Sequence, residues 1–196
     1  MAVLGPFTRL RKELAIVREA PEEDLRLWAN PDDLLEWSCH LRGPPDTSYA
    51  NGVFRLEIRC SEHYPLRPPT IWFETKIFHP NIHATTGEIC LDILKDAWSP
   101  AWTLREACRA VRALLADPNA DSPLNCDAGN LLRAGEDAAF AQQALECVQA
   151  HALREMPLDG GGAAAAVATD AARSTLWKWW ALCVGAPVLA AIFWLA

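Results

Sequence analysis

The chain has 196 residues, enough for one domain of ordinary size with an appendage but hardly for two full domains. Its formal net charge is -7, and the basic residues near its start alternate with acids, which argues against binding to nucleic-acid phosphates. Its seven cysteines lack paired metal-ligand spacing, and the first residues lack the apolar run of a secretory signal, so reduced cytosolic thiols are expected.

The first part of the chain predicts a helix followed by an antiparallel sheet. Apolar residues recur at helical spacing over residues 6–20, and Pro21 closes the segment. Strand-like runs follow at 25–29, 34–41, 53–60 and 70–74. Turn-forming residues separate the first three runs, and a proline-rich segment precedes the fourth. We therefore expect a four-stranded meander.

The second part predicts helices. Thr103 followed by Glu106 has the spacing of a capping box, which indicates a helix through Leu115. Two further helical segments are expected at 129–132 and 136–153.

Cys108 and Cys147 fall on two of these predicted helices, and we predict that they approach each other. A disulfide would need their Cβ atoms about 3.5–4.5 Å apart. The alternative is two separate buried thiols in a reducing compartment.

The most informative segment is HPNIHATTGEICLDIL, which places Cys90 nine residues after Asn81. Cys90 lies between a glycine bend and a short apolar run, which predicts a thiol at a turn. A thiolate is an effective nucleophile, and a nearby amide such as Asn81 can donate to an oxyanion. The alternatives are a buried structural cysteine and an asparagine that braces its own loop.

The sequence predicts neither a metal site nor a bound cofactor. His79, His83 and Cys90 lack an obvious fourth ligand, and their spacing differs from that of zinc sites. Residues 160–162 are three glycines, but the lysine and hydroxyl residue of a phosphate loop do not follow.

The C-terminal part has a different composition. Residues 156–172 are rich in glycine and alanine, as expected of a flexible linker. Residues 179–196 contain no charge, span roughly 27 Å as a helix, and have tryptophans near both ends. We therefore predict a membrane anchor over residues 173–196, with a buried core helix as the alternative.

Six segments occur in a characteristic order: GPPDTSYANGVFRLEI, YPLRPP, HPNI, GEICLDIL, WSPAWTL and PNADSPLN. Through them residues 5–152 resemble the ubiquitin-conjugating enzyme family. The extra residue between Asn81 and Cys90 and the segment SPLNCDAGNLLRAGE resemble its peroxisomal, peroxin-four branch. The resemblance implies an α/β (α+β) fold, a four-stranded antiparallel meander with an N-terminal helix and C-terminal helices. One transmembrane helix would follow a catalytic domain over residues 1–155.

The resemblance also implies roles for individual residues. Cys90 would accept ubiquitin as a thioester from an activating enzyme, which uses the ATP, and Asn81 would assist transfer to an amine. Asp121 and Ser122 lie where family members often carry an acidic residue that orients the incoming lysine. Serine occupies that acidic position here, which leaves the identity of the helper open.

A surface for a RING-type ligase is implied at Arg9, Leu66, Ser99, Pro100 and Ala101. Each also has a plainer interpretation: Arg9 as a solvated helix charge, Leu66 as an edge of the core, and residues 99–101 as a turn.

The sequence thus predicts a conjugating enzyme at the peroxisomal membrane that modifies import receptors. Its expected partners are ubiquitin, the activating enzyme, the ligase and the membrane, with a peroxisomal recruiter left open. One alternative is a tail-anchored enzyme of the endoplasmic reticulum that acts in protein quality control. The other is an inactive membrane-bound module that binds ubiquitin or a ligase.

Overall fold

A computed structural model describes residues 5–158. The predicted meander is confirmed as a four-stranded antiparallel sheet in the order β1-β2-β3-β4. Its strands are β1 (Leu25–Ala29), β2 (Glu36–Arg42), β3 (Val53–Arg59) and β4 (Thr70–Phe73). Helix α1 (Pro6–Glu19) precedes the sheet, and α2 (Leu104–Ala116), α3 (Cys126–Arg133) and α4 (Asp137–His151) follow it.

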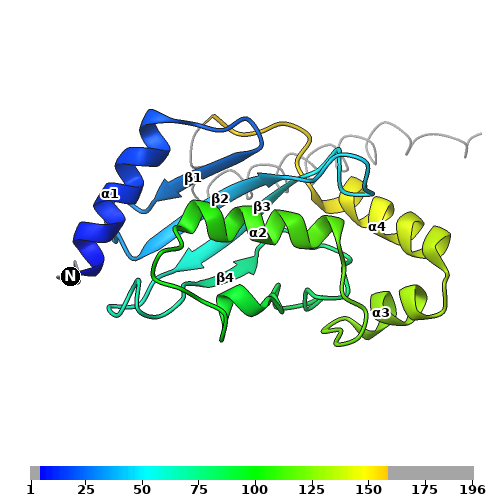
Figure 1. The fold of residues 1–196 in the computed structure, drawn as a ribbon. Helices are drawn as coiled ribbons and strands as arrows, with labels where there is room; N and C mark the ends of the chain where they lie inside the picture. The colour runs from blue at the N-terminus through cyan, green and yellow to red at the C-terminus, as the bar shows by residue number, and fades with distance from the viewer. Residues whose placement is uncertain (1–4, 159–196) are drawn as a thin grey trace, which may run out of the picture. The chain divides into compact units, whose positions relative to one another are not determined.

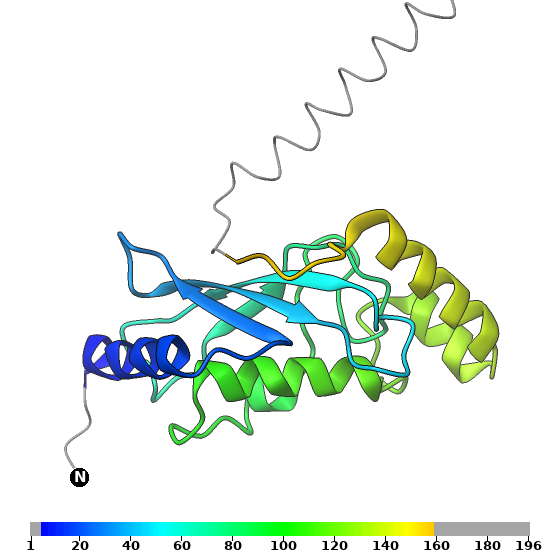
Figure 2. The same ribbon diagram turned by 90° about the horizontal axis from the view of Figure 1, so that it is seen from above.

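The core lies on one face of the sheet because apolar side chains alternate along each strand. The register aligns these positions across the strands: Cys39 is opposite Leu27 and Leu56, and Leu56 is also opposite Phe73. Helix α2 packs against this face with a row of buried apolar residues (Figure 1). The residues after α4 lie on the other side of the sheet (Figure 2).

Helix boundaries differ from the predicted ones by a few residues for local reasons. The capping box of α2 is confirmed, because Thr103 and Glu106 satisfy each other's backbone donors. Helix α3 is longer than predicted, since the Asn125 side chain caps it and it therefore begins at Cys126. Strand β2 begins two residues late because Asp33 accepts the Leu35 backbone N–H in a turn.

The predicted approach of Cys108 and Cys147 is wrong, because both thiols are free. Cys108 is buried on the face of α2 that packs on the sheet, where its thiol lies beside Cys39. Burial, and next the Cys108 thiol, raise the pKa of Cys39 well above its ordinary value. Cys147, on α4, instead contacts the Lys76 carbonyl at 3.6 Å.

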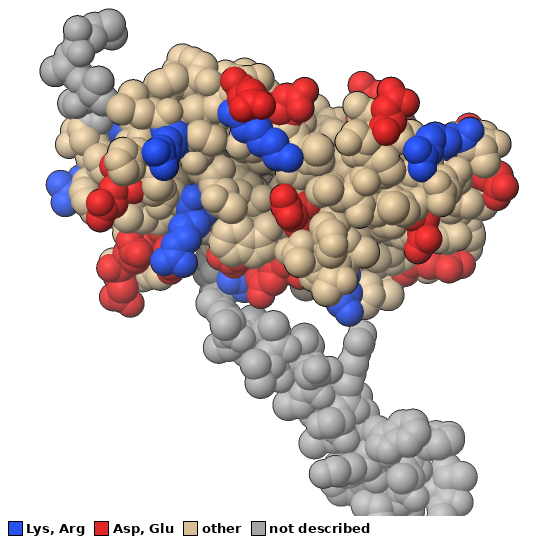
Figure 3. All heavy atoms as spheres, turned by 90° about the horizontal axis from the view of Figure 1, so that it is seen from below, with Lys and Arg blue, Asp and Glu red and all other residues tan. Residues whose placement is uncertain are grey.

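Within residues 5–158 no helix is long and apolar enough to cross a membrane. The predicted linker and anchor lie, apart from residues 156–158, outside this described range. Acidic and basic side chains are interspersed with uncharged surface on the face in Figure 3.

Candidate functional site

Cys90 ends a short hairpin-like segment that begins at Asn81. The Cys90 N–H donates to the Asn81 carbonyl at 2.8 Å, and the buried residues Ile82 and Ile89 form an isolated β-bridge between them. These contacts fix the backbone of Cys90 while its side chain remains partly exposed. The thiol is not deep in the core, as predicted, but Cys90 lies after the turn at residues 84–86 and not in it.

The turn of this segment requires a glycine. Gly87 has φ +72°, a conformation that side chains other than glycine rarely adopt. A Cβ atom there would lie 1.9 Å from the Phe73 carbonyl oxygen, while the Phe73 N–H donates to the Gly87 carbonyl at 2.9 Å. The close approach therefore attaches the turn before Cys90 to β4.

His79 connects the same segment to α2. The Asn81 N–H donates to His79 Nδ1 at 3.1 Å, so the proton of the neutral ring is on Nε2, which donates to the Leu114 carbonyl at 3.1 Å. Burial lowers the pKa of His79 to about 4, so the ring is neutral at physiological pH. Because both ring nitrogens are engaged, His79 has a structural place here and neither nitrogen is free to bind a metal.

The Asn81 side chain holds the loop that follows α2. Its Nδ2 donates to the Asn119 carbonyl at 2.7 Å, and its Oδ1 accepts the Asn119 N–H at 2.8 Å. The side chain is buried, with 3% exposure. Asn81 therefore braces the loop after α2, whereas its structural interpretation had it brace its own loop. Its amide nitrogen carries a second hydrogen that the Asn119 carbonyl does not use.

Asp121 and Ser122 lie in the braced loop, between α2 and α3. Both side chains are exposed. The Asp121 N–H donates to Asn119 Oδ1 at 2.9 Å, so Asp121 connects through Asn119 to Asn81, and through Asn81 to Cys90. The loop with these two candidates is thus tied to the Cys90 segment by consecutive hydrogen bonds.

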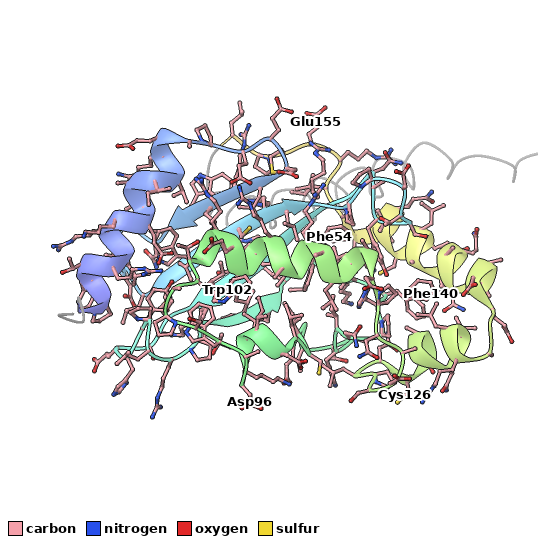
Figure 4. The ribbon with its side chains drawn as sticks, viewed as in Figure 1. Phe54, Asp96, Trp102, Cys126, Phe140 and Glu155 are labelled. Carbon is pink, nitrogen blue, oxygen red and sulfur yellow. The ribbon has the colours of Figure 1, made fainter. Side chains whose placement is uncertain are left out.

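The sequence analysis missed Lys95 as a neighbour of the thiol. Lys95 follows a short 3-10 helix, η1 (Asp92–Leu94), and its Nζ donates to Cys90 Sγ at 3.8 Å. Figure 4 shows the next residue, Asp96, projecting from this turn, far from Cys126 at the start of α3. The signal that could have revealed the contact is the spacing of five residues, since one tight turn after Cys90 brings Lys95 back to the thiol.

The residues proposed to face a ligase are held together from three segments. Arg9 Nη2 donates to the Trp102 carbonyl at 2.7 Å, next to the loop of Ser99, Pro100 and Ala101, and Figure 4 shows Trp102 at the start of α2. Trp98 Nε1 donates to the Pro65 carbonyl at 2.7 Å, beside Leu66. Leu66 is 57% exposed, and Pro100 and Ala101 are also exposed, whereas Ser99 is half-buried.

Glu13 joins these segments, although its sequence context gives only an acid on an amphipathic helix. It is 4% exposed, and its carboxylate accepts bonds from Arg9 at 2.6 Å, the Tyr64 hydroxyl at 2.7 Å and the Leu104 N–H at 2.8 Å. Burial and the neighbouring Glu13 raise the pKa of Tyr64, which keeps its hydroxyl a donor. Arg9 is therefore an ion-paired strut with partly exposed atoms, not a freely solvated charge.

The family model described as "Ubiquitin-conjugating enzyme" matches residues 9–148. The chain belongs to the ubiquitin-conjugating enzyme family. It is 51% identical to Protein PEROXIN-4 of Arabidopsis thaliana over 138 residues, covering 69% of this chain and 88% of the relative. It is 55% identical to ubiquitin-conjugating enzyme E2 pex4 of Dictyostelium discoideum over 129 residues, covering 65% and 87%.

Solved structures agree with this assignment. The E2 domain of a Toxoplasma gondii ubiquitin conjugating enzyme has a TM-score of 0.70 at 37% identity, covering 75% of this chain and 99% of that one. A putative ubiquitin conjugating enzyme from Plasmodium yoelii has a TM-score of 0.72 at 35% identity, covering 80% and 100%. The predicted α/β fold with its four-stranded antiparallel sheet and the predicted enzyme class are confirmed, and the family implies ubiquitin, an activating enzyme and a ligase as general partners.

Proposed function

We propose that Cys90 carries ubiquitin as a thioester, and the observation that carries this proposal is its partly exposed thiol on a fixed backbone. The thiolate attacks the thioester carbonyl on the activating enzyme, a new C–S bond forms, and the activating enzyme's thiolate leaves. Exchange between thioesters needs no metal or cofactor on this chain, because ATP is spent earlier by the activating enzyme.

Transfer to an amine is the step that requires help. Attack on the thioester places negative charge on the carbonyl oxygen, and the second N–H of Asn81 supplies a donor for it. Asp121 and Ser122 are proposed to orient the incoming lysine, since both are exposed on the loop that Asn81 braces. Asn81 thus combines bracing with donation.

The joined surface of Arg9, Leu66 and residues 99–101 is proposed to bind a RING-type ligase. The exposed Leu66 supplies an apolar anchor, and the Glu13 network keeps its loop, α1 and the start of α2 in one arrangement. Arg9 acts there as a positioning residue.

We also propose that the enzyme modifies import receptors at the peroxisomal membrane, held by an anchor over residues 173–196 behind a linker over 156–172. The relatives named PEROXIN-4 and pex4 support the organelle, and the uncharged run over residues 179–196 supports the anchor. A built-in anchor would make a separate recruiter dispensable.

Two experiments test these proposals. The chain is incubated with activating enzyme, Mg-ATP and either ubiquitin or a ubiquitin-like modifier, and a reductant-sensitive adduct should form with ubiquitin but not with the other modifier. Absence of any adduct would favour the inactive binding module. A tagged full-length chain should colocalise with peroxisomal markers. Colocalisation with endoplasmic-reticulum markers would instead support the quality-control alternative.

A further inference from the structure

The extra residue between Asn81 and Cys90 has no role in the proposed mechanism. It lengthens the segment that joins them, whose turn lies at residues 84–86. The two arms of this turn are paired, and the pair nearest the turn is closed by the His83 N–H, which donates to the Glu88 carbonyl at 2.9 Å. Asn81 and Cys90 therefore lie on paired arms whose alignment depends on the turn.

The side chain of His83 closes this turn. Its Nδ1 accepts the Thr85 N–H at 3.3 Å and the Thr86 N–H at 3.1 Å. Since both partners are donors, Nδ1 must offer a lone pair, and the neutral ring carries its proton on Nε2. Each such bond changes the ratio of closed to open turn by a factor of about 2–10. A protonated ring donates from both nitrogens, so it cannot accept either bond.

Two histidines of this segment accept backbone N–H groups in the same way but differ in burial. His79 is fully buried, and burial lowers its pKa to about 4, so it stays neutral above that pH. His83 is partly exposed, and imidazole is the side chain whose charge ordinarily changes between about pH 5 and 8. Of the two, His83 is therefore the one that can respond to pH while the fold is intact.

The charged groups around His83 are carboxylates. On its own hairpin, Glu88 is exposed on the facing arm. On the sheet edge against which the turn packs, Glu57 and Glu74 are both paired with Arg55, at 2.8 and 2.7 Å. Among the described residues no ion pair includes His83 itself. Carboxylates favour a positive ring, so none of them holds His83 in its neutral form.

We propose that His83 is a positioning residue for transfer from Cys90 and that it acts only as the neutral ring. In this form it closes the turn and keeps the arm of Asn81 in register with the arm of Cys90. Protonation removes the acceptor at Nδ1, the turn opens, and transfer to an amine slows. Activity should therefore be lost as the pH falls. The effect on transfer rests on the proposed function of Cys90 and Asn81, whereas the opening of the turn does not.

The test compares full-length wild type with His83→Asn. An asparagine Oδ1 accepts the N–H two residues on in turns of this kind, and it does not titrate. Preloaded ubiquitin is discharged to free lysine in a single turnover between about pH 8 and 6. Each variant rate is divided by the wild-type rate at the same pH, which cancels the protonation of lysine. The ratio should be near 1 at about pH 8 and rise about 2–4-fold by about pH 6, where most ordinary imidazoles are protonated.

Two further variants bracket this comparison. His83→Leu removes the acceptor at every pH, so it should be slower than the wild type at about pH 8 as well, by about 3-fold or more. The matched control His151→Asn changes an exposed histidine at the end of α4 and should follow the wild type throughout. A His83→Leu chain as fast as the wild type at about pH 8 would overturn the positioning role.

A second measurement follows the turn directly. Solvent exchange of the Thr85 and Thr86 amides, measured by NMR relative to His83→Asn at each pH, should rise about 2–4-fold in the wild type between about pH 8 and 6. Equal exchange in both chains overturns the pH-sensitive turn. A turn that opens while both chains keep the same pH profile of transfer overturns the positioning role alone. Absence of any reductant-sensitive adduct overturns the carrier role of Cys90, and the exchange measurement still decides whether the turn responds to His83.

Discussion

Substitution of Asn81 by alanine separates bracing from donation. Asn81→Ala removes both hydrogen bonds to the Asn119 backbone, at 2.7 and 2.8 Å. Each is worth about 0.5–1.5 kcal/mol net, and the exposed Asn119 can bind water instead, so the free energy of unfolding should fall by about 1–3 kcal/mol. Loss of an oxyanion donor would in addition slow amine transfer by about 10²–10³-fold.

The assay is single-turnover discharge of preloaded ubiquitin to free lysine, with the rate of loading measured separately. Asn81→Ala should load within about 3-fold of the wild type and discharge about 10²–10³-fold more slowly. Asn119→Gly is the matched control, since it loosens the same loop by removing the Asn119 Oδ1 contact with Asp121 but leaves the Asn81 amide in place. If both variants slow discharge equally, or if Asn81→Ala slows loading as much as discharge, donation by Asn81 is refuted.

Three further predictions concern stability and location. Glu13→Ala should lower the free energy of unfolding by about 3–5 kcal/mol in denaturant titrations, because it leaves the buried Tyr64 hydroxyl and the Leu104 N–H without their acceptor. The exposed control Glu19→Ala should change the free energy of unfolding by less than about 0.5 kcal/mol. A loss under about 1 kcal/mol for Glu13→Ala would contradict the network. The unfolded chain protonates His79 near pH 6.5 and the folded chain only near pH 4, so the free energy of unfolding should fall by up to about 3 kcal/mol as the pH drops through that window. A His79→Gln variant should lack this pH-dependent loss. Equal acid sensitivity of the two chains would contradict it. Deleting residues 176–196 should leave charging intact and abolish membrane attachment. A truncated chain that still sediments with membranes after a carbonate wash would rule out the anchor.

The sheet and most helices could be predicted because their signals are local. Strand-like runs bounded by turn-forming and proline-rich segments predicted the four strands, and the spacing of Thr103 and Glu106 predicted the start of α2. Predicted ends were less accurate where a single side chain decides them, as Asn125 does for α3.

Contacts within the site were less predictable because they join distant segments. The neighbours of Cys90 predicted a thiol outside the core, but not that its segment is held to the loop after α2 by Asn81 and Asn119, 38 residues apart. The role of Glu13 depends on Leu104, 91 residues away, and periodicity carries no information about such a pair. The same limit explains the error at Cys108, since helical spacing does not say which element the thiol faces.

The most direct test of the central claim is the intact mass of the charged chain before and after reductant. We predict that the wild type and the exposed-cysteine control Cys126→Ser each gain one ubiquitin that reductant removes. Cys90→Ser should instead give a reductant-resistant ester or no adduct. A reductant-sensitive adduct on Cys90→Ser would show that another cysteine carries ubiquitin and would contradict the assignment.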